Sequence, residues 1–130
     1  MGAAENKEVV RKLREAKGID AMFATMADDI RWTIMGTTKY SHTMKGKQEI
    51  LHKLLKPITA ELESMGTSID DNIIAEGDFV VLQQHATGRQ TKTGKPYNNH
   101  YCLIYKVIDG KIKEITEYLD TELVTAAFGR

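Results

Sequence analysis

The sequence is poor in cysteine, in proline and in long apolar runs. Its 130 residues include one cysteine, Cys102, so an internal disulfide and a metal site built from several thiolates are excluded. A single free thiol is typical of a reducing compartment, and we expect a cytoplasmic location. No run of about 18 apolar residues is present, which argues against a membrane-spanning helix. The polar, charged N-terminus does not resemble a signal peptide.

The chain also lacks an excess of either charge. Its 18 basic residues balance 18 acidic ones, so neither nucleic acid nor a membrane surface is predicted as a partner. The four histidines show no ligand spacing with carboxylates, and we predict no metal. No phosphate loop, nucleophile elbow or dinucleotide fingerprint is present, and we predict no cofactor. The length predicts one domain that spans residues 1–130.

The first half of the chain predicts helices separated by one strand. Apolar residues at helical spacing predict amphipathic helices over residues 5–16 and 19–27. Alternating apolar and polar residues predict a strand over residues 30–35, followed by a polar loop. A third helix is expected over residues 47–65, and Pro57 within it should kink it or start a new turn.

The second half of the chain predicts strands and a final short helix. Four runs have the composition of strands, and the last two are joined by a tight Asp-Gly turn. Asp120 is expected to cap the terminal helix. This order of elements indicates an α+β domain with its helices gathered on one face of a curved antiparallel sheet. The four strands are expected over residues 67–75, 79–88, 96–108 and 111–119.

Several short motifs, taken in order, extend over nearly the whole chain. They are Trp32, Gly46, Glu76-Gly77-Asp78, Thr93-Gly94, Tyr97-Asn98, Asp109-Gly110-Lys111-Ile112 and Glu117-Tyr118-Leu119-Asp120. Their order and spacing resemble the SnoaL-like branch of the nuclear transport factor 2-like superfamily. Its relatives include ketosteroid isomerase, polyketide cyclases and limonene-epoxide hydrolase. The resemblance implies a cone-shaped, cystatin-like α+β roll whose N-terminal helices close a pocket, a small-molecule ligand, and a homodimer formed through the sheet.

The same resemblance implies that the concave sheet face lines the pocket. Side chains alternate between the two faces of a strand, so the lining residues follow from strand parity. Each predicted strand then contributes every second residue to the pocket. The predicted substrate-binding residues are Trp32, Ile34, Leu82, Gln84, Ala86, Leu103 and Ile115.

One carboxylate, Glu117, is expected on this largely apolar face. Aligned motif to motif, it falls where limonene-epoxide hydrolase and SnoaL-like cyclases resemble one another in placing a catalytic aspartate. Burial raises the pKa of a carboxyl group, and a base poised near neutral pH suits proton abstraction beside a carbonyl. We predict Glu117 as the general acid/base of a cofactor-free isomerase or cyclase. Tyr101 and Asn99 are predicted to donate hydrogen bonds to a developing enolate oxygen.

Several alternatives stay open from the sequence. The hydrolase's arginine and aspartate positions read Gln84 and Ala86 here, which disfavours epoxide hydrolysis. Glu117 has a structural alternative, which is an ion pair with a nearby cation or a hydrogen-bond network with Asn99 or Gln84. The catalytic reading of Asp120 is disfavoured relative to its role as a helix cap. The alternative function is a non-catalytic module that binds a small ligand or forms a dimer.

Overall fold

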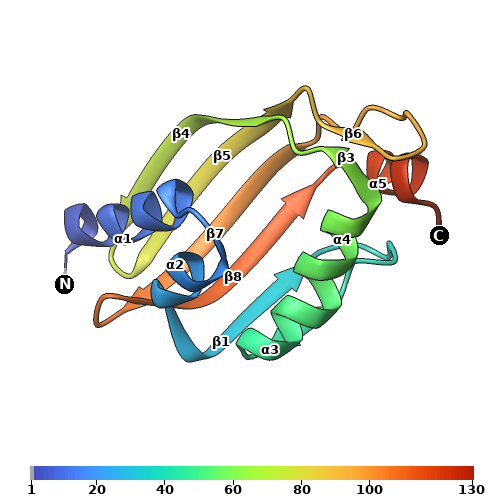
Figure 1. Cartoon of the computed structure of the whole chain (residues 1–130). Helices are drawn as coiled ribbons and strands as arrows, with labels where there is room; N and C mark the ends of the chain where they lie inside the picture. Colours follow the sequence, from blue (N-terminus) through green and yellow to red (C-terminus); the bar gives the residue numbers. More distant parts are fainter. Residues whose placement is uncertain (1) are drawn as a thin grey trace.

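A strongly bent six-stranded sheet forms one wall of the molecule (Figure 1). The computed structural model describes residues 2–130, so Met1 of the expected domain lies outside the described residues. Neighbouring strands follow the order β2-β1-β8-β7-β5-β4, and β3 pairs with β6 in a small second sheet. The elements are α1 (Ala3–Glu15), α2 (Ile19–Ala24), β1 (Met26–Ile34), β2 (Thr43–Lys45), α3 (Lys47–Ile50), η1 (Leu51–Leu55), α4 (Lys56–Glu61), β3 (Leu62–Ser64), β4 (Thr67–Glu76), β5 (Phe79–Thr87), β6 (Gln90–Thr91), β7 (His100–Ile108), β8 (Lys111–Leu119) and α5 (Thr121–Phe128).

The predicted α+β cone is confirmed, with one difference in strand direction. The sequence predicts an antiparallel sheet, and all but one of the pairings in the main sheet are antiparallel. The exception is the pairing of β1 with β8, which is parallel and places Ile34 opposite Glu117. These two strands are joined by most of the chain rather than by a hairpin, so their direction is not fixed by a short turn.

The hairpin between β7 and β8 forms as predicted. Asp109 and Gly110 have φ angles of 50° and 78°, the left-handed conformations that a two-residue type I′ turn requires. The pairing that follows places Leu103 opposite Glu117 and Tyr101 opposite Leu119. The turn sets the pairing next to it, and a register shift of one residue between Lys106 and Val107 then brings these side chains to the same sheet face.

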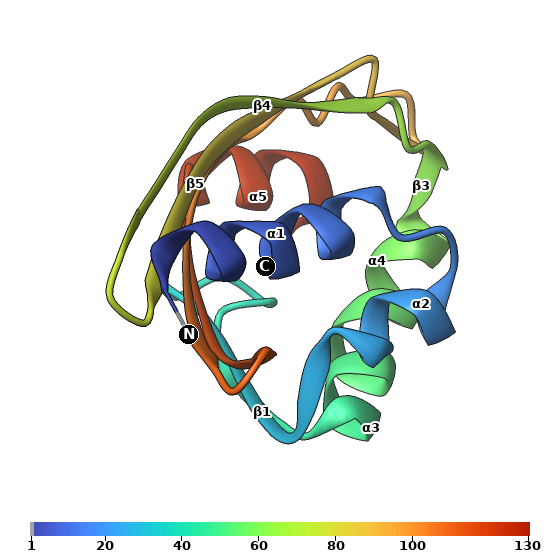
Figure 2. The same cartoon turned by 90° about the vertical axis from the view of Figure 1, so that its left-hand side faces the viewer.

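Helices α1 to α4 lie on the concave side of the sheet (Figure 2). The single helix expected over residues 47–65 is instead divided into α3, the π-helical turn η1 and α4, and it ends at Glu61. Pro57 lies in the first turn of α4. Proline lacks a backbone N–H, so the regular hydrogen-bond ladder is interrupted here, and the wider π turn lies directly before it.

Helix α5 closes one end of the cone. Asp120 Oδ1 accepts a hydrogen bond of 3.2 Å from the backbone N–H of Leu123, which confirms its predicted role as helix cap. Phe128 packs edge-on against Tyr97 and Tyr40, with ring centroids 4.6 and 5.6 Å apart. These contacts join the helix to the hydrophobic core between the sheet and the helices.

Short elements account for the other differences from the predicted pattern. Helix α2 ends at Ala24, and β1 begins at Met26, within the range expected to be helical. The expected polar loop contains the three-residue strand β2, because Met44 in it is fully buried against the core. Within residues 2–130, no helix has the length and apolar character needed to cross a membrane.

Candidate functional site

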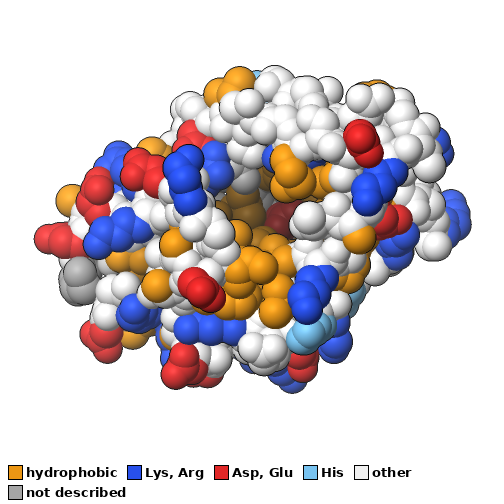
Figure 3. Space-filling view, viewed as in Figure 1, with side chains coloured by type: hydrophobic (Ala, Val, Ile, Leu, Met, Phe, Trp, Pro, Cys, Tyr) orange, Lys and Arg blue, Asp and Glu red, His pale blue; other side chains and the backbone are white. Residues whose placement is uncertain are grey.

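A cavity of about 180 Å³ lies between the concave sheet face and helices α1 and α2. In the space-filling view, hydrophobic side chains surround a hollow on this side of the molecule, and an acidic side chain is visible deep inside it (Figure 3). Five of the predicted site residues line the cavity. They are Trp32, Gln84, Tyr101, Leu103 and Glu117.

Glu117 is the buried acid of this cavity. Strand β8 places its side chain on the concave face, where it is only 8% exposed. The indole Nε1–H of Trp32 donates a hydrogen bond of 3.0 Å to Glu117 Oε1. Among residues 2–130, no lysine, arginine or histidine lies within ion-pair distance of this carboxylate. The ion pair considered as a structural alternative is therefore absent from the described part of the chain.

The surroundings of Glu117 shift its protonation toward neutral pH. Burial raises the pKa of the Glu117 carboxyl from 4.5 to about 7, because the charged form loses water. The hydrogen bond from Trp32 and the positive charge of Arg89 act in the opposite direction, and both are weaker than the effect of burial. A carboxyl with a pKa near 7 exchanges protons readily at neutral pH.

Tyr101 supplies a hydroxyl to the same cavity. Burial raises the pKa of Tyr101 well above its ordinary value, so the hydroxyl stays protonated. Arg89 Nη1 donates to Tyr101 Oη at 3.3 Å, and a hydrogen bond with the Tyr97 side chain further favours the protonated form of Tyr101. The guanidinium is held in place by the Met65 carbonyl at 2.8 Å and by Ser68 Oγ at 3.0 Å. Tyr101 thus presents a protonated hydroxyl whose oxygen accepts a hydrogen bond from a cation held in place.

Gln84 brings an amide group with an unused acceptor. Its Oε1 atom is buried and has no hydrogen-bond partner among the described residues. Buried polar atoms are nearly always paired, and an unpaired one beside a cavity marks a place where a ligand group or a water completes the bonding. Gln84 is therefore a candidate for positioning a ligand. The hydrogen bond between Gln84 and Glu117 that was considered as a structural alternative is not among the hydrogen bonds of the described residues.

The structure does not place Asn99 at the cavity, where its predicted catalytic role requires it. Its side chain is fully buried outside the cavity lining. Asn99 Nδ2 donates to Tyr97 Oη at 3.3 Å and to the Asp120 carbonyl at 3.0 Å. Its Oδ1 accepts from the backbone N–H groups of Asp120 and His100, at 3.0 and 2.7 Å. Asn99 therefore fixes the start of β7 to the end of β8, and it has no hydrogen left to donate to a substrate.

Four predicted substrate-binding residues also lie outside the cavity lining. They share the concave face, but core side chains cover them, and each is at most 4% exposed. Strand parity identifies the face correctly, but it does not show where along a strand the core ends and the cavity begins. These core residues are Ile34, Leu82, Ala86 and Ile115.

The sequence analysis also missed four residues that line the cavity. Tyr105 was identifiable, because it has the same parity as Tyr101 and Leu103 on β7. Leu13 and Arg14 come from α1 and Met22 comes from α2, and no local pattern indicates which helix face meets the pocket. Arg14 forms an ion pair of 2.7 Å with Asp70, so its charge is already partnered.

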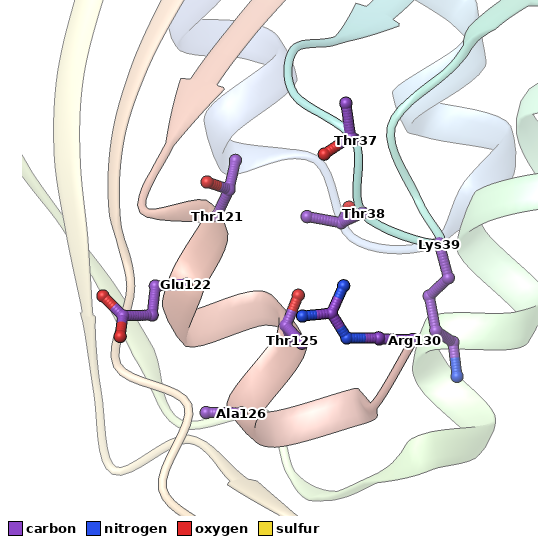
Figure 4. A pocket seen from close by; sticks show the side chains of 8 residues that line it. All are labelled: Thr37, Thr38, Lys39, Thr121, Glu122, Thr125, Ala126 and Arg130. Carbon is purple, nitrogen blue, oxygen red and sulfur yellow. The ribbon is translucent and has the colours of Figure 1, made fainter.

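A larger hollow of about 620 Å³ lies elsewhere, between α5 and the loop before β2 (Figure 4). Its lining is mostly polar, and it includes four threonines from α5 and the loop as well as Lys39 and Arg130. Lys39 pairs with Glu61 at 3.0 Å. The hollow is open, and its only acid, Glu122, lies at the surface. It therefore lacks the desolvated acid that distinguishes the cavity around Glu117.

Comparison with known proteins agrees with this architecture. The model of the SnoaL-like domain family matches residues 8–115. The chain belongs to the SnoaL-like family. No curated protein matches the sequence.

Solved structures show the same fold across the chain. A nuclear transport factor 2-like protein from Burkholderia thailandensis E264 is 24% identical, covers 98% of each chain and has a TM-score of 0.84. A candidate SnoaL-like polyketide cyclase from Jannaschia sp. CCS1 is 20% identical. The alignment covers 98% of this chain and 93% of the Jannaschia chain, with a TM-score of 0.79. TerC, co-crystallised with polyporic acid, is 21% identical. The alignment covers 95% of this chain and 97% of TerC, with a TM-score of 0.78. A shared fold does not identify the reaction, which has to be argued from the site.

Proposed function

We propose that this SnoaL-like protein is a cofactor-free isomerase or cyclase in which Glu117 moves a proton on a small, largely apolar carbonyl compound. One observation carries the proposal. Glu117 is an unpaired, buried carboxylate in a cavity, and its pKa is raised to about 7. An acid with no cationic partner and a pKa at neutrality has the properties required of a general acid/base.

The residues around Glu117 have complementary roles in such a reaction. The Glu117 carboxylate takes a proton from the carbon beside the carbonyl, and the electron pair of the broken C–H bond moves to the carbonyl oxygen as an enolate. The Tyr101 hydroxyl donates to that oxygen, and Arg89 strengthens the donor from behind. Protonated Glu117 then returns the proton to carbon, at the same or a different position. The hydrogen bond from Trp32 holds the carboxylate in one orientation.

The structural relatives are compatible with this proposal. TerC has the same fold and was crystallised with polyporic acid, and the Jannaschia protein is described as a polyketide cyclase candidate. At identities near 20% these likenesses support a small-molecule pocket in this fold and do not specify a substrate. The proposed chemistry therefore rests on Glu117 and Tyr101.

A second candidate function is binding of a small ligand without turnover. The unpaired Gln84 Oε1 beside the cavity favours it, because this acceptor offers a ligand a hydrogen bond and has no part in proton transfer. In this case Glu117 would accept a hydrogen bond or donate one without proton transfer. A measured rate of proton transfer separates the two functions.

Exchange of ketone α-protons for deuterium, followed by NMR with 2-butanone in D₂O, tests the proposed function. Glu117 acts as a base only when it is ionised, so the rate should increase about tenfold per pH unit below about pH 7 and level off above it. A rate that equals the buffer-catalysed rate at every pH would contradict the catalytic proposal and favour ligand binding without turnover.

We also propose that two copies pair through the convex sheet face and that the protein is cytoplasmic. The convex face carries four large hydrophobic residues that are 42–61% exposed. Isolated exposed hydrophobic residues are common on protein surfaces, whereas several on one face indicate an interaction site. Sedimentation velocity should give twice the chain mass of 14.6 kDa. A monomer at all concentrations would contradict the pairing. The four residues are Ile69, Ile74, Phe79 and Tyr118.

A further inference from the structure

A second, apolar pocket of about 500 Å³ lies at the mouth of the cone. It is formed by α2, the segment around Gly18, the end of η1, α4, and the turn before β4. Two of its hydrophobic residues, Ile19 and Met65, are 41% and 53% exposed. Leu55 and Met22 form deeper parts of its wall. We call this pocket the vestibule.

The vestibule and the Glu117 cavity meet at one side chain. Met22 lines both, so the two spaces adjoin at this residue. In the space-filling view, an acidic side chain lies deep in an opening that is edged by hydrophobic side chains (Figure 3). Methionine is unbranched and flexible, so its side chain yields more readily to a ligand than a branched or aromatic one.

The π-helical turn contributes to the shape of the vestibule. Within η1, Leu54 is buried in the core, whereas its neighbour Leu55 is only partly buried and faces the vestibule. A π turn widens the helix by one residue, and such turns occur frequently at functional sites. The irregular segment before Pro57 thus exposes one more hydrophobic side chain to the pocket.

We propose that the ligand is elongated, with its carbonyl group at Glu117 and an unbranched apolar tail that passes Met22 into the vestibule. This inference rests on the proposed function for the position of the carbonyl, and on geometry for the tail. The inner cavity alone is smaller than a usual ligand pocket, whereas the two adjoining spaces together fall within the usual range. Because the two spaces adjoin at Met22, a ligand that displaces this side chain can occupy both.

A series of straight-chain 2-alkanones from butanone to dodecanone tests the proposal by binding. The single tryptophan of the chain, Trp32, lines the inner cavity, and its fluorescence reports occupancy independently of turnover. Each added methylene buried in the vestibule should tighten the dissociation constant about fourfold until the tail emerges into solvent. Equal affinity across the series would overturn the proposal.

Two variants locate the tail. Met65→Gln places a polar group in the vestibule, so it should weaken binding of the longest ketones at least tenfold and leave 2-butanone unchanged. Met35→Gln is the matched control, because Met35 is also an exposed methionine (40%) and lines neither pocket, and it should leave the whole series unchanged. A Met65→Gln protein that behaves like the control would overturn the proposal.

Other outcomes separate this inference from the proposed function. Affinity that increases with chain length, combined with no proton exchange, would retire the catalytic role of Glu117 and support the elongated ligand. Proton exchange combined with affinity that does not depend on chain length would support the catalytic role of Glu117 and overturn the elongated ligand. A vestibule covered by a second copy of the chain would appear as a change of sedimentation coefficient in Met65→Gln, and it would overturn the proposal.

Discussion

Replacing Glu117 by glutamine should lower the rate of α-proton exchange by about 100- to 10,000-fold, which is the range that a general acid/base contributes. Glutamine has nearly the same shape, and its amide oxygen can still accept the hydrogen bond from Trp32 Nε1 that Glu117 Oε1 accepts at 3.0 Å. The substitution therefore removes the titrating group and leaves the cavity walls in place. The exchange rate of 2-butanone α-protons, measured by NMR, checks the prediction.

The matched control is the same change at the neighbouring acid of the motif. Asp120 lies three residues after Glu117, is exposed, and caps α5. Asparagine caps helices about as well as aspartate, so Asp120→Asn should keep both the fold and the exchange rate. Equal loss in the two variants, or full activity in Glu117→Gln, would contradict the assignment of the chemistry to Glu117.

The second large effect of Glu117→Gln is on stability. The substitution should stabilise the fold at neutral pH, although it lowers activity. The pKa of Glu117 is about 7 in the fold and 4.5 in the unfolded chain, so between these values the folded protein holds a proton that the unfolded chain has lost. The free energy of unfolding therefore decreases as the pH rises from about 4.5 to about 7, and stays at the lower value above that. The loss for this one group is about 3 kcal/mol, since each pKa unit corresponds to about 1.4 kcal/mol.

Glutamine carries no charge at any pH and escapes this loss. Glu117→Gln should thus resemble the wild type below about pH 4.5 and exceed it by roughly 3 kcal/mol near pH 8. Urea unfolding of both proteins at the two pH values gives the difference, and comparing them cancels the contributions of all other carboxylates. A variant that is less stable than the wild type near pH 8 would show that Glu117 is a structural residue. A gain in stability together with a loss of activity is expected of a residue retained for function.

Strand patterns in the sequence predict the sheet and half of the site. Alternation along β5, β7 and β8 assigns Gln84, Tyr101, Leu103 and Glu117 to the concave face, and all four line the cavity. The side-chain period of a strand is two residues, so a strand assignment fixes which residues share a face as long as the strand contains no bulge. The register of the last hairpin depends on the Asp-Gly turn and also on a shift of one residue between Lys106 and Val107, which places Leu103 opposite Glu117.

The depth of each residue could not be predicted in the same way. Ile115 and Glu117 share one face of β8, yet the first lies in the core and the second lines the cavity, because helices cover only part of the sheet. The contribution of Met22 depends on how α2 packs across the mouth of the cone, which no local pattern specifies. Asn99 lies just before β7 rather than within the expected strand, and the end of β8 offers it backbone partners.

The central claim is that Glu117 is a buried, unpaired acid that titrates near neutral pH inside a ligand cavity. A pH titration of Trp32 fluorescence tests it most directly, because the indole Nε1–H donates to the Glu117 carboxylate and the chain has no other tryptophan. We predict a single transition with a midpoint near pH 7 in the wild type, and no transition at that pH in Glu117→Gln. A midpoint near 4.5 would contradict the account, and so would a transition near 7 that persists in Glu117→Gln.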